Sequence, residues 1–431
     1  MSVLDEHVGQ ERLPRLNVMK QFSRSVPEMT DARSLPAPPA LPSEEARTTI
    51  QRFVALAVRG LVPMFDEQKQ LFCYSLKKTG EGMAREGLSP RYTMMTLMGL
   101  HRFEEAGGTS PIAIEPVLHR LLENLDWVED IGDLGVLLWT CALLAPEYLA
   151  ELEGRISLET SLTRYRSAQR GVTMELAWFL TGLSNWVLAC PEKRSGLRDL
   201  AFQTFALLKQ NRGEQGFFGH LARGGSVIGM TRGRIGSFAD QVYPIYAMTR
   251  FSQAYQEDSA LRMALKCGRG LCEAQGSLGQ WWWHYDSLGG GVLEGYPVFS
   301  VHQHAMGPMT MFALGEAAQY DFTPWIYRGL QWINSKNELG FNMEDDAAQV
   351  IWRCQYRSAS QIKTYLKAAL NLGAAAKPFE AKKDLKVLFE CRPYELGWLL
   401  YAFAARNGRP VSAAAERHSA AVGHGMVGGK R

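Results

Sequence analysis

Acidic and histidine side chains stand at the starts of several predicted helices in this chain. Asp240 and His302 each follow a serine at the beginning of a helical segment, and Glu175 lies in the first turn of another. Carboxylates and imidazoles are the groups that proteins most often use as general acids and bases. We therefore predict that Asp240, His302 and Glu175 are the catalytic residues, with Asp240 as the first candidate.

An aromatic and glycine-rich stretch, residues 279 to 309, joins two predicted helices and reads GQWWWHYDSLGGGVLEGYPVFSVHQHAMGPM. It is too aromatic for an ordinary connection, and aromatic faces suit a sugar ring or an isoprenoid. Consecutive tryptophans cannot all face one core, so we expect at least one indole to face a cleft or solvent. The predicted substrate-binding residues, from this stretch and from other helix starts and loops, are Trp281, Trp282, Trp283, Tyr285, Asp286, Tyr296, His304, Arg91, Tyr92, Tyr243 and Arg223.

The catalytic candidates also have structural explanations. Asp240 fits the last position of a capping box, and Glu175 fits an acid that compensates a helix dipole. His302 and His304 are two residues apart, whereas helical histidines that share a metal ion are four apart. We therefore predict no metal site, and the predicted chemistry requires no cofactor.

Apolar residues recur with a helical period from about residue 48 to residue 408, and alternating β-branched runs are scarce. The pattern predicts an all-α protein whose first helix starts near Ser43. Residues 1–45 are polar and end in a Pro-rich piece, which predicts an extended or disordered segment. The predicted organisation is a disordered N-terminal segment (1–45), one helical catalytic domain (46–408) and a flexible tail (409–431).

A turn in which an aromatic residue follows a glycine recurs after the predicted helices. It occurs as Gly216-Phe217-Phe218, Gly279-Gln280-Trp281 and Gly340-Phe341, with glutamines before it at Gln210, Gln275 and Gln331. A new helix is predicted 20 to 22 residues after an aromatic residue, which pairs Phe218 with Asp240, Trp281 with His302, Phe341 with Gln361 and Phe72 with Tyr92. Ser237, Ser300 and Ser358 open capping-box patterns at three of these helix starts. Equivalent repeats would place all four loops on one rim.

These turns, at the spacing of helix pairs, resemble the repeats of (α/α) toroids. That group holds the six-hairpin glycosidases, the toroid polysaccharide lyases, the terpenoid cyclases, the protein prenyltransferases and the lanthionine cyclases. The resemblance covers roughly residues 48 to 408 and is architectural. It implies an (α/α)6-type toroid of helical hairpins, with inner helices inside a ring of outer helices and a site at the end formed by the loops before the inner helices.

Charge and cysteine content narrow the function classes. The formal net charge of +3 gives no strong field for nucleic acid or an anionic membrane. The seven cysteines include no CxxC pair, which favours buried thiols in a reducing compartment. The opening residues, MSVLDEHVGQERLPRLN, lack the apolar core of a secretory signal, and no apolar run is long enough to span a membrane. We expect a cytoplasmic protein with a small-molecule or glycan substrate, and the sequence leaves the oligomeric state open.

Two carbohydrate chemistries fit the candidate residues. A glycosidase needs two carboxylates, which Asp240 and Glu175 on neighbouring inner helices would supply. A polysaccharide lyase or uronate epimerase needs a base beside groups that neutralise a carboxylate, and Tyr296, His302 and Arg223 would serve.

An isoprenoid chemistry also fits. A cyclase of that class needs a protonated aspartate in an aromatic cavity, but its D-x-D-D motif has only a poor match at residues 342–346. For the glycosidase chemistry described above, Asp286 and Glu294 could replace Asp240 or Glu175 as one of the two carboxylates. The mixture of charged and aromatic candidates favours a carbohydrate-active enzyme that cleaves or remodels an acidic oligosaccharide, polysaccharide or lipid-linked glycan in a central cleft. The alternatives are an isoprenoid cyclase or prenyltransferase-like enzyme and a non-catalytic helical scaffold.

Overall fold

A computed structural model of the chain describes residues 44–167, 171–224, 227–357 and 384–406. All of them lie in the second of the two compact units into which the chain divides, Pro38–Arg431. Residues 1–43 of the predicted disordered segment, the predicted tail and the predicted helix start at Gln361 fall outside the described residues.

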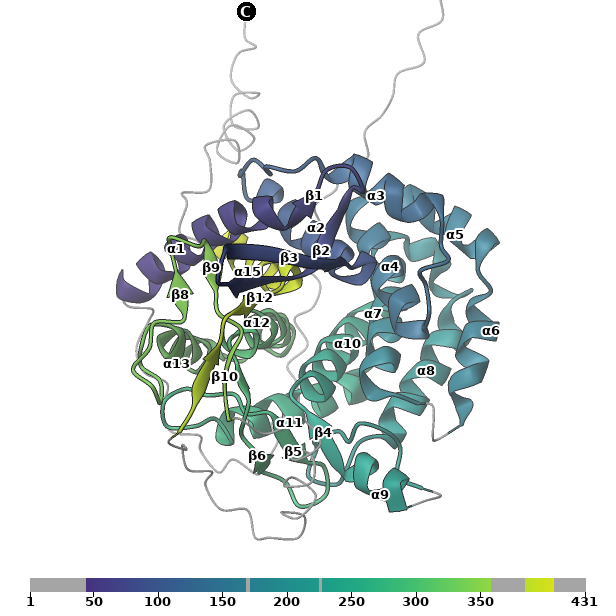
Figure 1. Cartoon of the computed structure of the whole chain (residues 1–431). Coiled ribbons are helices and arrows are strands. Elements are labelled where there is room, and N and C mark those ends of the chain that lie inside the picture. The colour runs from purple at the N-terminus through teal and green to yellow at the C-terminus, as the bar shows by residue number, and fades with distance from the viewer. Residues whose placement is uncertain (1–43, 168–170, 225–226, 358–383, 407–431) are drawn as a thin grey trace, which may run out of the picture. The chain divides into compact units, whose positions relative to one another are not determined.

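Within this unit the described residues form an inner ring of six helices (Figure 1). They are α2 (Pro90–Glu105), α4 (Ile131–Leu144), α7 (Thr173–Ala189), α10 (Ala239–Tyr255), α12 (Gly307–Ala318) and α15 (Pro393–Phe403). Each inner helix contacts the next, and α15 contacts α2, which closes the ring. Their sequences are apolar nearly all round, as the unbroken buried run of α4 from Ile131 to Ala142 shows, and such helices belong to a protein interior.

Glycines let neighbouring inner helices approach closely. A Cβ atom on Gly99 of α2 would lie 2.1 Å from the carbonyl oxygen of Gly397 in α15. A Cβ atom on Gly182 of α7 would lie 2.4 Å from the carbonyl oxygen of Gly135 in α4. Larger residues at these positions would force the backbones apart, so glycine sets the tight spacing of the ring on this side.

Amphipathic helices pack on the outside of the ring. They are α1 (Glu44–Leu61), α3 (Ile114–Glu123), α5 (Leu149–Arg155), α6 (Leu158–Thr163), α8 (Arg198–Gln210), α11 (Asp258–Glu273) and α13 (Thr323–Ile333). In α11 the buried side chains of Ala260, Ala264, Cys267 and Leu271 recur on one helical face. The predicted toroid of helical hairpins is confirmed, and the first helix begins at Glu44, beside the predicted Ser43.

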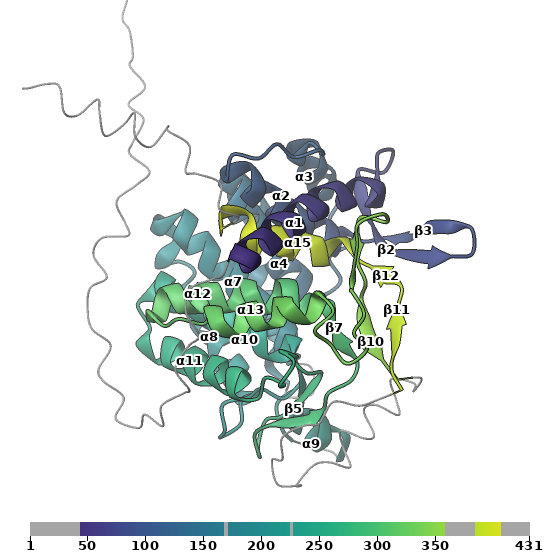
Figure 2. The ribbon, with the colours of Figure 1, turned by 90° about the vertical axis from the view of Figure 1, so that its left-hand side faces the viewer.

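Short strands, which the helical sequence pattern did not predict, lie in the loops that precede inner helices. They are β1 (Phe65–Asp66), β2 (Leu71–Thr79), β3 (Gly82–Leu88), β4 (Ile235–Ser237), β5 (His284–Asp286), β6 (Val292–Glu294), β7 (Val298–Phe299), β8 (Glu344–Asp345), β9 (Val350–Ile351), β10 (Cys354–Tyr356), β11 (Lys386–Leu388) and β12 (Glu390–Cys391). Figure 2 shows strands β2, β3, β7, β10, β11 and β12 together on one side of the helices. One further helix, α9 (Val227–Arg234), lies in the loop before α10.

Antiparallel pairing between these strands joins neighbouring loops into a belt. Strand β4 before α10 pairs with β5 before α12, β7 before α12 pairs with β10 before α15, and β12 before α15 pairs with β2 before α2. The loops before four inner helices are therefore hydrogen-bonded to one another at one end of the ring. We call this end, with the first turns of the inner helices, the N-terminal rim.

Side chains from the starts of neighbouring inner helices meet along the N-terminal rim. The contacts are Arg91 with Asp133, Phe238 with His302, and Tyr92 with Tyr394. Because the inner helices begin at the same end, Tyr92, Asp240 and His302 share one rim, as the repeat predicts.

The recurring turn has a clear backbone basis. Gly216, Gly279 and Gly340 have φ values of +105°, +94° and +61°, which favour glycine. In each turn the glycine amide donates to the carbonyl of the residue three positions earlier, at 2.9 to 3.1 Å. The glutamine part of the repeat does not hold, because Gln275 bonds the carbonyl of Gly279 whereas Gln210 is exposed.

The constant loop length also has a cause. The side chain of Gln241 bonds both the amide and the carbonyl of Phe218, at 2.7 and 2.9 Å. The side chain of Gln303 does the same to Trp281, at 3.0 and 3.2 Å. A residue in the first turn of α10, or in the π-helical turn His302–Met306 that leads into α12, therefore holds the aromatic residue that follows the outer helix. Gln303, the last residue of the capping-box pattern that Ser300 opens, therefore does not act as a cap.

Aromatic side chains fill the centre of the ring. Trp139 of α4 stacks on Trp398 of α15, with ring centroids 5.1 Å apart, and lies 4.9 Å from Tyr246 of α10. The indole nitrogen of Trp398 donates to the hydroxyl of Tyr243 at 3.2 Å. These helices are not neighbours in the ring, so their side chains meet across its axis, and ligand contacts are expected at the rim.

Among the described helices, none is long and apolar enough to cross a bilayer. The seven cysteines all lie in the described parts of the chain; six are buried, Cys190 is partly exposed, and all are free thiols.

Candidate functional site

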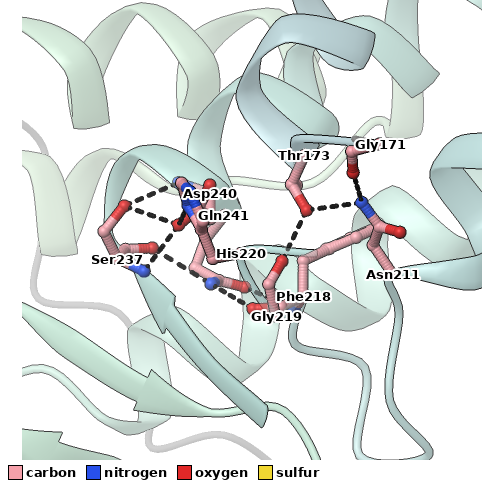
Figure 3. Close-up of polar contacts among 9 residues, drawn as sticks. All are labelled: Gly171, Thr173, Asn211, Phe218, Gly219, His220, Ser237, Asp240 and Gln241. Atoms are coloured by element: carbon pink, nitrogen blue, oxygen red, sulfur yellow. Dashed lines mark hydrogen bonds and ion pairs between the residues drawn. The ribbon is translucent and has the colours of Figure 1, made fainter. Parts of the chain in front are cut away.

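A histidine–aspartate pair lies at the start of α10 on the N-terminal rim (Figure 3). Nδ1 of His220 lies 3.2 Å from Oδ2 of Asp240. Asp240 is buried, whereas the side chain of His220 is 30% exposed. Asp240 also accepts hydrogen bonds from the amide and hydroxyl of Ser237, both at 2.9 Å, and its own amide donates to that hydroxyl at 3.2 Å. The predicted capping box is confirmed here, and its carboxylate also orients His220.

The backbone that carries His220 is held at every polar group, and Figure 3 shows the contacts that Gln241 and Thr173 make with it. In the run Phe218-Gly219-His220, the first residue is bonded through both main-chain groups by Gln241, as described above. Gly219 donates to the carbonyl of Asn211 at 2.8 Å and accepts from the hydroxyl of Thr173. The amide of His220 donates to the carbonyl of Ile235 at 3.0 Å, and the carbonyl of His220 accepts from the amide of Thr173 at 3.0 Å. Full satisfaction of a buried backbone gives a rigid support for the imidazole.

Two glycines allow this packing. A Cβ atom on Gly219 would lie 2.0 Å from the carbonyl oxygen of Gly233, and one on Gly236 would lie 1.9 Å from the carbonyl oxygen of Phe218. The end of α9 and the strand β4 can therefore press against the His220 segment only because both positions lack a side chain.

Burial and pairing act in opposite directions on the pKa of each residue of the pair. Burial disfavours the imidazolium of His220, but the charge and hydrogen bond of Asp240 outweigh it and raise the pKa of His220 above 6.5. Burial also disfavours the carboxylate of Asp240, but His220 and Ser237 outweigh it and lower the pKa of Asp240 below 3.8. With Nδ1 of His220 directed at Asp240, Nε2 is the ring nitrogen left to exchange a proton. A carboxylate-oriented imidazole of this kind suits general acid–base work.

Glu175 in the first turn of α7 is a second titratable group on the rim. It is half-buried, and the hydroxyl of Tyr165 donates to its Oε2 at 2.6 Å. Burial raises the pKa of Glu175 more than the Tyr165 hydrogen bond and the charges of Arg91 and His220 lower it. A carboxyl group whose pKa is raised can deliver a proton as a general acid. Because His220 is among the charges that act on it, the two groups lie close enough to interact.

Arg91 supplies positive charge between α2 and α4. Its guanidinium bonds Asp133 at 2.5 Å and Asp130 at 2.8 Å, and lies 5.3 Å from the ring centroid of Trp178. The side chain remains 29% exposed, so part of the cation stays available at the rim. Asp133, by contrast, is buried and committed to Arg91.

His302 differs from His220 in its surroundings. It is buried, and its Nδ1 lies 3.4 Å from the carbonyl oxygen of Trp281. Burial lowers the pKa of His302 to about 3, so the imidazole is neutral near pH 7. Trp283 lies parallel to the ring at 6.2 Å and is partly exposed. The catalytic role of His302 stays a prediction, and the neutral ring is a poorer proton donor than His220.

Most of the predicted stacking residues lie inside the wall of the rim. Trp281, Trp282, Tyr285, His304, Tyr243 and Tyr296 are all at most 3% exposed. A side chain without free surface cannot stack on a ligand, so the prediction that Trp281, Trp282 and Tyr285 form stacking subsites does not hold for this conformation. Of the three consecutive indoles Trp283 is partly exposed, in agreement with the expectation that at least one faces a cleft or solvent.

The two substitute carboxylates are occupied by ion pairs. Arg234 bonds both oxygens of Asp286, at 2.8 and 2.6 Å. Arg357 bonds Glu294 at 2.9 Å. These pairs fix the loops before α10 and α12, and they make Asp286 and Glu294 poor replacements for a catalytic acid. Arg223 is exposed.

The opposite side of the rim, where α15 meets α2, carries a dense charged cluster. Arg353 forms an ion pair with the fully buried Glu395 and lies 3.5 Å from Glu390. Nε of Arg392 donates to Glu390 at 2.6 Å, and Nη1 donates to the hydroxyl of Tyr92 at 2.9 Å. Tyr92, a predicted binding residue, is thus placed beside two arginines that the sequence analysis did not select.

Metal-binding residues are not grouped in the part of the chain that the structure describes, where no three histidine, cysteine, aspartate or glutamate side chains are arranged to hold a metal ion.

Comparisons with known proteins identify the fold. No protein-family model matches the sequence, and a search of curated proteins found no match. Several solved structures are similar. Unsaturated glucuronyl hydrolase from Bacillus sp. GL1, described as responsible for the degradation of glycosaminoglycan, shares 12% identity and a TM-score of 0.52, over 85% of this chain and 98% of the other.

Two further structures are similar over comparable lengths. A possible member of the GH105 family from Salmonella enterica shares 10% identity and a TM-score of 0.54, over 86% of this chain and 96% of the other. A glycosyl hydrolase of family 88 from Bacteroides vulgatus shares 10% identity and a TM-score of 0.51, over 84% of this chain and 99% of the other. The chain therefore has the six-hairpin (α/α)6 toroid fold that these glycoside hydrolases share.

Proposed function

We propose that this chain is a carbohydrate-active enzyme that cleaves or remodels an acidic oligosaccharide by acid–base chemistry at the N-terminal rim. The observation that carries the proposal is the partly exposed His220, oriented by the buried Asp240 at 3.2 Å. Other pairs on the rim, such as Arg234 with Asp286, also join a buried carboxylate to a partly exposed cation, but an imidazole, unlike a guanidinium, gains and loses a proton near neutral pH. Here the carboxylate is enclosed, whereas the imidazole keeps exposed surface.

The roles follow from protonation and position. His220 exchanges a proton with the substrate or with water through Nε2. Asp240 is a positioning residue, because its carboxylate acts through His220. Glu175, whose pKa burial raises, donates the second proton as a general acid. Hydrolysis would use both groups in one turnover, and elimination would use one of them to remove the proton beside a carboxylate.

Charges on the rim support an acidic substrate. Arg91, Arg353 and Arg392 are partly exposed there, although each is paired with a carboxylate. Guanidinium groups bind carboxylates through charge-assisted hydrogen bonds. The similar folds described above also come from hydrolases, some named for unsaturated glucuronyl substrates.

The alternatives agree less well with the rim. An isoprenoid cyclase would need an almost uncharged aromatic wall, whereas this rim carries arginines, carboxylates and a polarised histidine. A non-catalytic scaffold would not need a buried carboxylate directed at a partly exposed imidazole.

The test is a product screen with matched variants. The purified protein is incubated with uronate-containing oligosaccharides, both saturated and with an unsaturated terminal uronate, and the products are weighed by mass spectrometry. Hydrolysis adds one water per bond cleaved, elimination adds none, and isomerisation leaves the mass unchanged. We expect turnover that His220→Gln lowers by about 10²- to 10⁴-fold. His119→Gln, a change at a half-exposed histidine away from this pair, should leave the rate unchanged.

Two results would contradict the proposal. His220→Gln could retain the full rate of glycan turnover, or the protein could consume an isoprenoid diphosphate while leaving every glycan intact.

A further inference from the structure

Three tyrosine rings form a continuous ladder where α15 and the β2–β3 hairpin meet the start of α2. Tyr74 of β2 stacks on Tyr92 of α2, with ring centroids 5.3 Å apart and planes 19° apart. Tyr92 in turn lies 4.5 Å from Tyr394 of α15. Tyr394 lies in the first turn of the inner helix α15. The ladder therefore leads from the 43% exposed Tyr74 toward the filled centre of the ring.

Arg392 lies against the outer part of this ladder. Its guanidinium carbon is 4.3 Å from the ring centroid of Tyr74 and 5.9 Å from that of Tyr92. Glu390 and the Tyr92 hydroxyl take hydrogen bonds from Nε and Nη1, as described above. Nη2 bonds no residue of the described parts of the chain, and the side chain is 17% exposed. One arm of a planar, fixed donor group is therefore left for a ligand.

The charge around Arg392 is not fully compensated. Arg353 and Arg392 face Glu390 and Glu395, while Lys77 is paired with Glu86 at 2.5 Å and lies 4.0 Å from Glu390. Glu395 is buried, and among the described residues none forms a hydrogen bond with its Oε2. Burial, only partly offset by Arg353, raises the pKa of Glu395 to about 7, so near neutral pH a fraction of it is uncharged. Two arginines then face less than two negative charges, which favours an additional anion.

We propose that Arg392, Tyr74 and Tyr92 form a second subsite on the N-terminal rim that binds an acidic sugar residue of an oligosaccharide. The carboxylate of that residue is held by Nη2 of Arg392, and its ring lies against the exposed part of Tyr74. Planar guanidinium groups suit carboxylates, and tyrosine faces suit the apolar faces of sugar rings. The subsite rests on the proposed function, because it assigns a place for a part of the same substrate.

The position of the subsite has a consequence for substrate length. In the ring order, α4 and α7 lie between the start of α2 and the start of α10, so Arg392 and His220 belong to different sectors of the rim. A single sugar residue that reacts at His220 does not reach Tyr74 on the hairpin. The enzyme should therefore prefer an oligosaccharide with a carboxylate on a residue away from the reacting bond.

A binding experiment tests the subsite without turnover. A glucuronate-containing tetrasaccharide is titrated calorimetrically into the His220→Gln variant, beside the same sugar with its carboxyl groups reduced to alcohols. We expect the acidic sugar to bind more tightly, and we expect Arg392→Gln in the same background to weaken it at least tenfold and to remove the preference. Arg85→Gln, at an exposed arginine on the same hairpin, should change neither affinity.

A second variant protects the test against loss of folding. Tyr74 is an exposed side chain, so Tyr74→Ala should leave the melting temperature nearly unchanged while it weakens the tetrasaccharide, and Tyr74→Phe should keep wild-type affinity. Unchanged affinity in both Arg392→Gln and Tyr74→Ala would overturn the subsite. Tighter binding of inorganic phosphate or pyrophosphate than of glucuronate, lost in Arg392→Gln, would overturn the assignment to a carboxylate.

The outcomes separate the subsite from the proposed function. Arg392-dependent binding of the acidic sugar without any turnover by the wild-type protein would support the subsite and refute the proposed enzyme activity. Glycan turnover with a KM that Arg392→Gln leaves unchanged would support the activity and refute the subsite.

Discussion

Replacing Asp240 by asparagine isolates the effect of one buried charge on His220. The two side chains have nearly the same shape, and the amide oxygen can still accept from the amide and hydroxyl of Ser237, so the start of α10 should keep its cap. The charge that raises the pKa of His220 is lost. Burial, the largest influence on this imidazole, is then opposed only by the weaker influence of Glu175 and should bring the pKa below 6.5.

The size of the change follows from the geometry of the pair. An opposite charge within about 4–6 Å shifts a pKa by about 1–3 units, and the two atoms here are 3.2 Å apart. We therefore expect the pKa of His220 to fall by about 1–3 units in Asp240→Asn. The acidic limb of the pH–rate profile should move in the same direction if His220 acts as a base.

The pH dependence of folding stability should report on the same pair. The raised pKa of His220 contributes stability below about 6.5 that is lost as pH rises, and the lowered pKa of Asp240 contributes stability above about 3.8 that is lost as pH falls. The difference in unfolding free energy between wild type and Asp240→Asn should therefore be largest between these two values.

The assay is an NMR titration of the imidazole resonances, with His220 assigned from its loss in His220→Gln. His119, a half-exposed histidine away from this pair, serves as an internal reference for the pH of each sample. Ser237→Ala removes one cap contact but keeps the charge of Asp240, so His220 should stay above its ordinary pKa there. An unchanged His220 pKa in Asp240→Asn would refute the argument that this carboxylate controls the imidazole.

Further predictions concern the support of the rim. Gln303→Ala leaves the amide of the buried Trp281 unpaired and should cost about 1–3 kcal/mol in urea unfolding, whereas the exposed Gln210→Ala should cost under about 0.5 kcal/mol. Glu395 has a folded pKa of about 7 against an ordinary 4.5, so wild-type stability should fall by about 3 kcal/mol as pH rises across that interval, and Glu395→Gln should lack this fall. Gly340→Ala, at φ +61° with no atom near the added Cβ, should lower stability by about 1–2 kcal/mol. Gly279→Ala should lower it more, because its Cβ would lie 2.2 Å from the carbonyl oxygen of Arg328. Equal losses in the two variants would contradict the clash argument.

The helical ring could be predicted from the sequence because its signals are local. Apolar runs with a helical period gave the helices, and the recurring glycine–aromatic turn gave their pairing into hairpins. The turn can be recognised in the sequence because a positive φ at Gly216, Gly279 and Gly340 favours glycine. The constant loop length can also be recognised in the sequence, because a side chain at the helix start, such as Gln241, must reach the preceding aromatic residue.

The strands and most of the site depend on contacts that a single sequence does not display. Strands such as β4 and β5 are three residues long, and they exist because neighbouring loops pair with each other across the rim. Arg353 and Arg392 lie far from Tyr92 in the chain and carry no motif. The tryptophan triplet predicted a binding role for three indoles, of which Trp281 and Trp282 are buried, because burial depends on which loops cover them.

His220 shows what a sequence signal could have found. It follows Phe218 by two residues, directly after a recurring turn, and Asp240 stands in the next helix start. The capping box explained Asp240 completely, so nothing in the pattern required a partner for it. The structure shows that the same carboxylate oxygen serves both Ser237 and His220.

The central claim is that catalysis takes place beside His220 on the N-terminal rim. Its most direct test is a crystal structure of the His220→Gln variant with an oligosaccharide that the wild-type enzyme converts. The account predicts that the reacting bond lies within hydrogen-bond reach of position 220 and beside Glu175. A sugar chain bound at the opposite end of the ring, or on the outer helices, with the same bond remote from both residues, would contradict it.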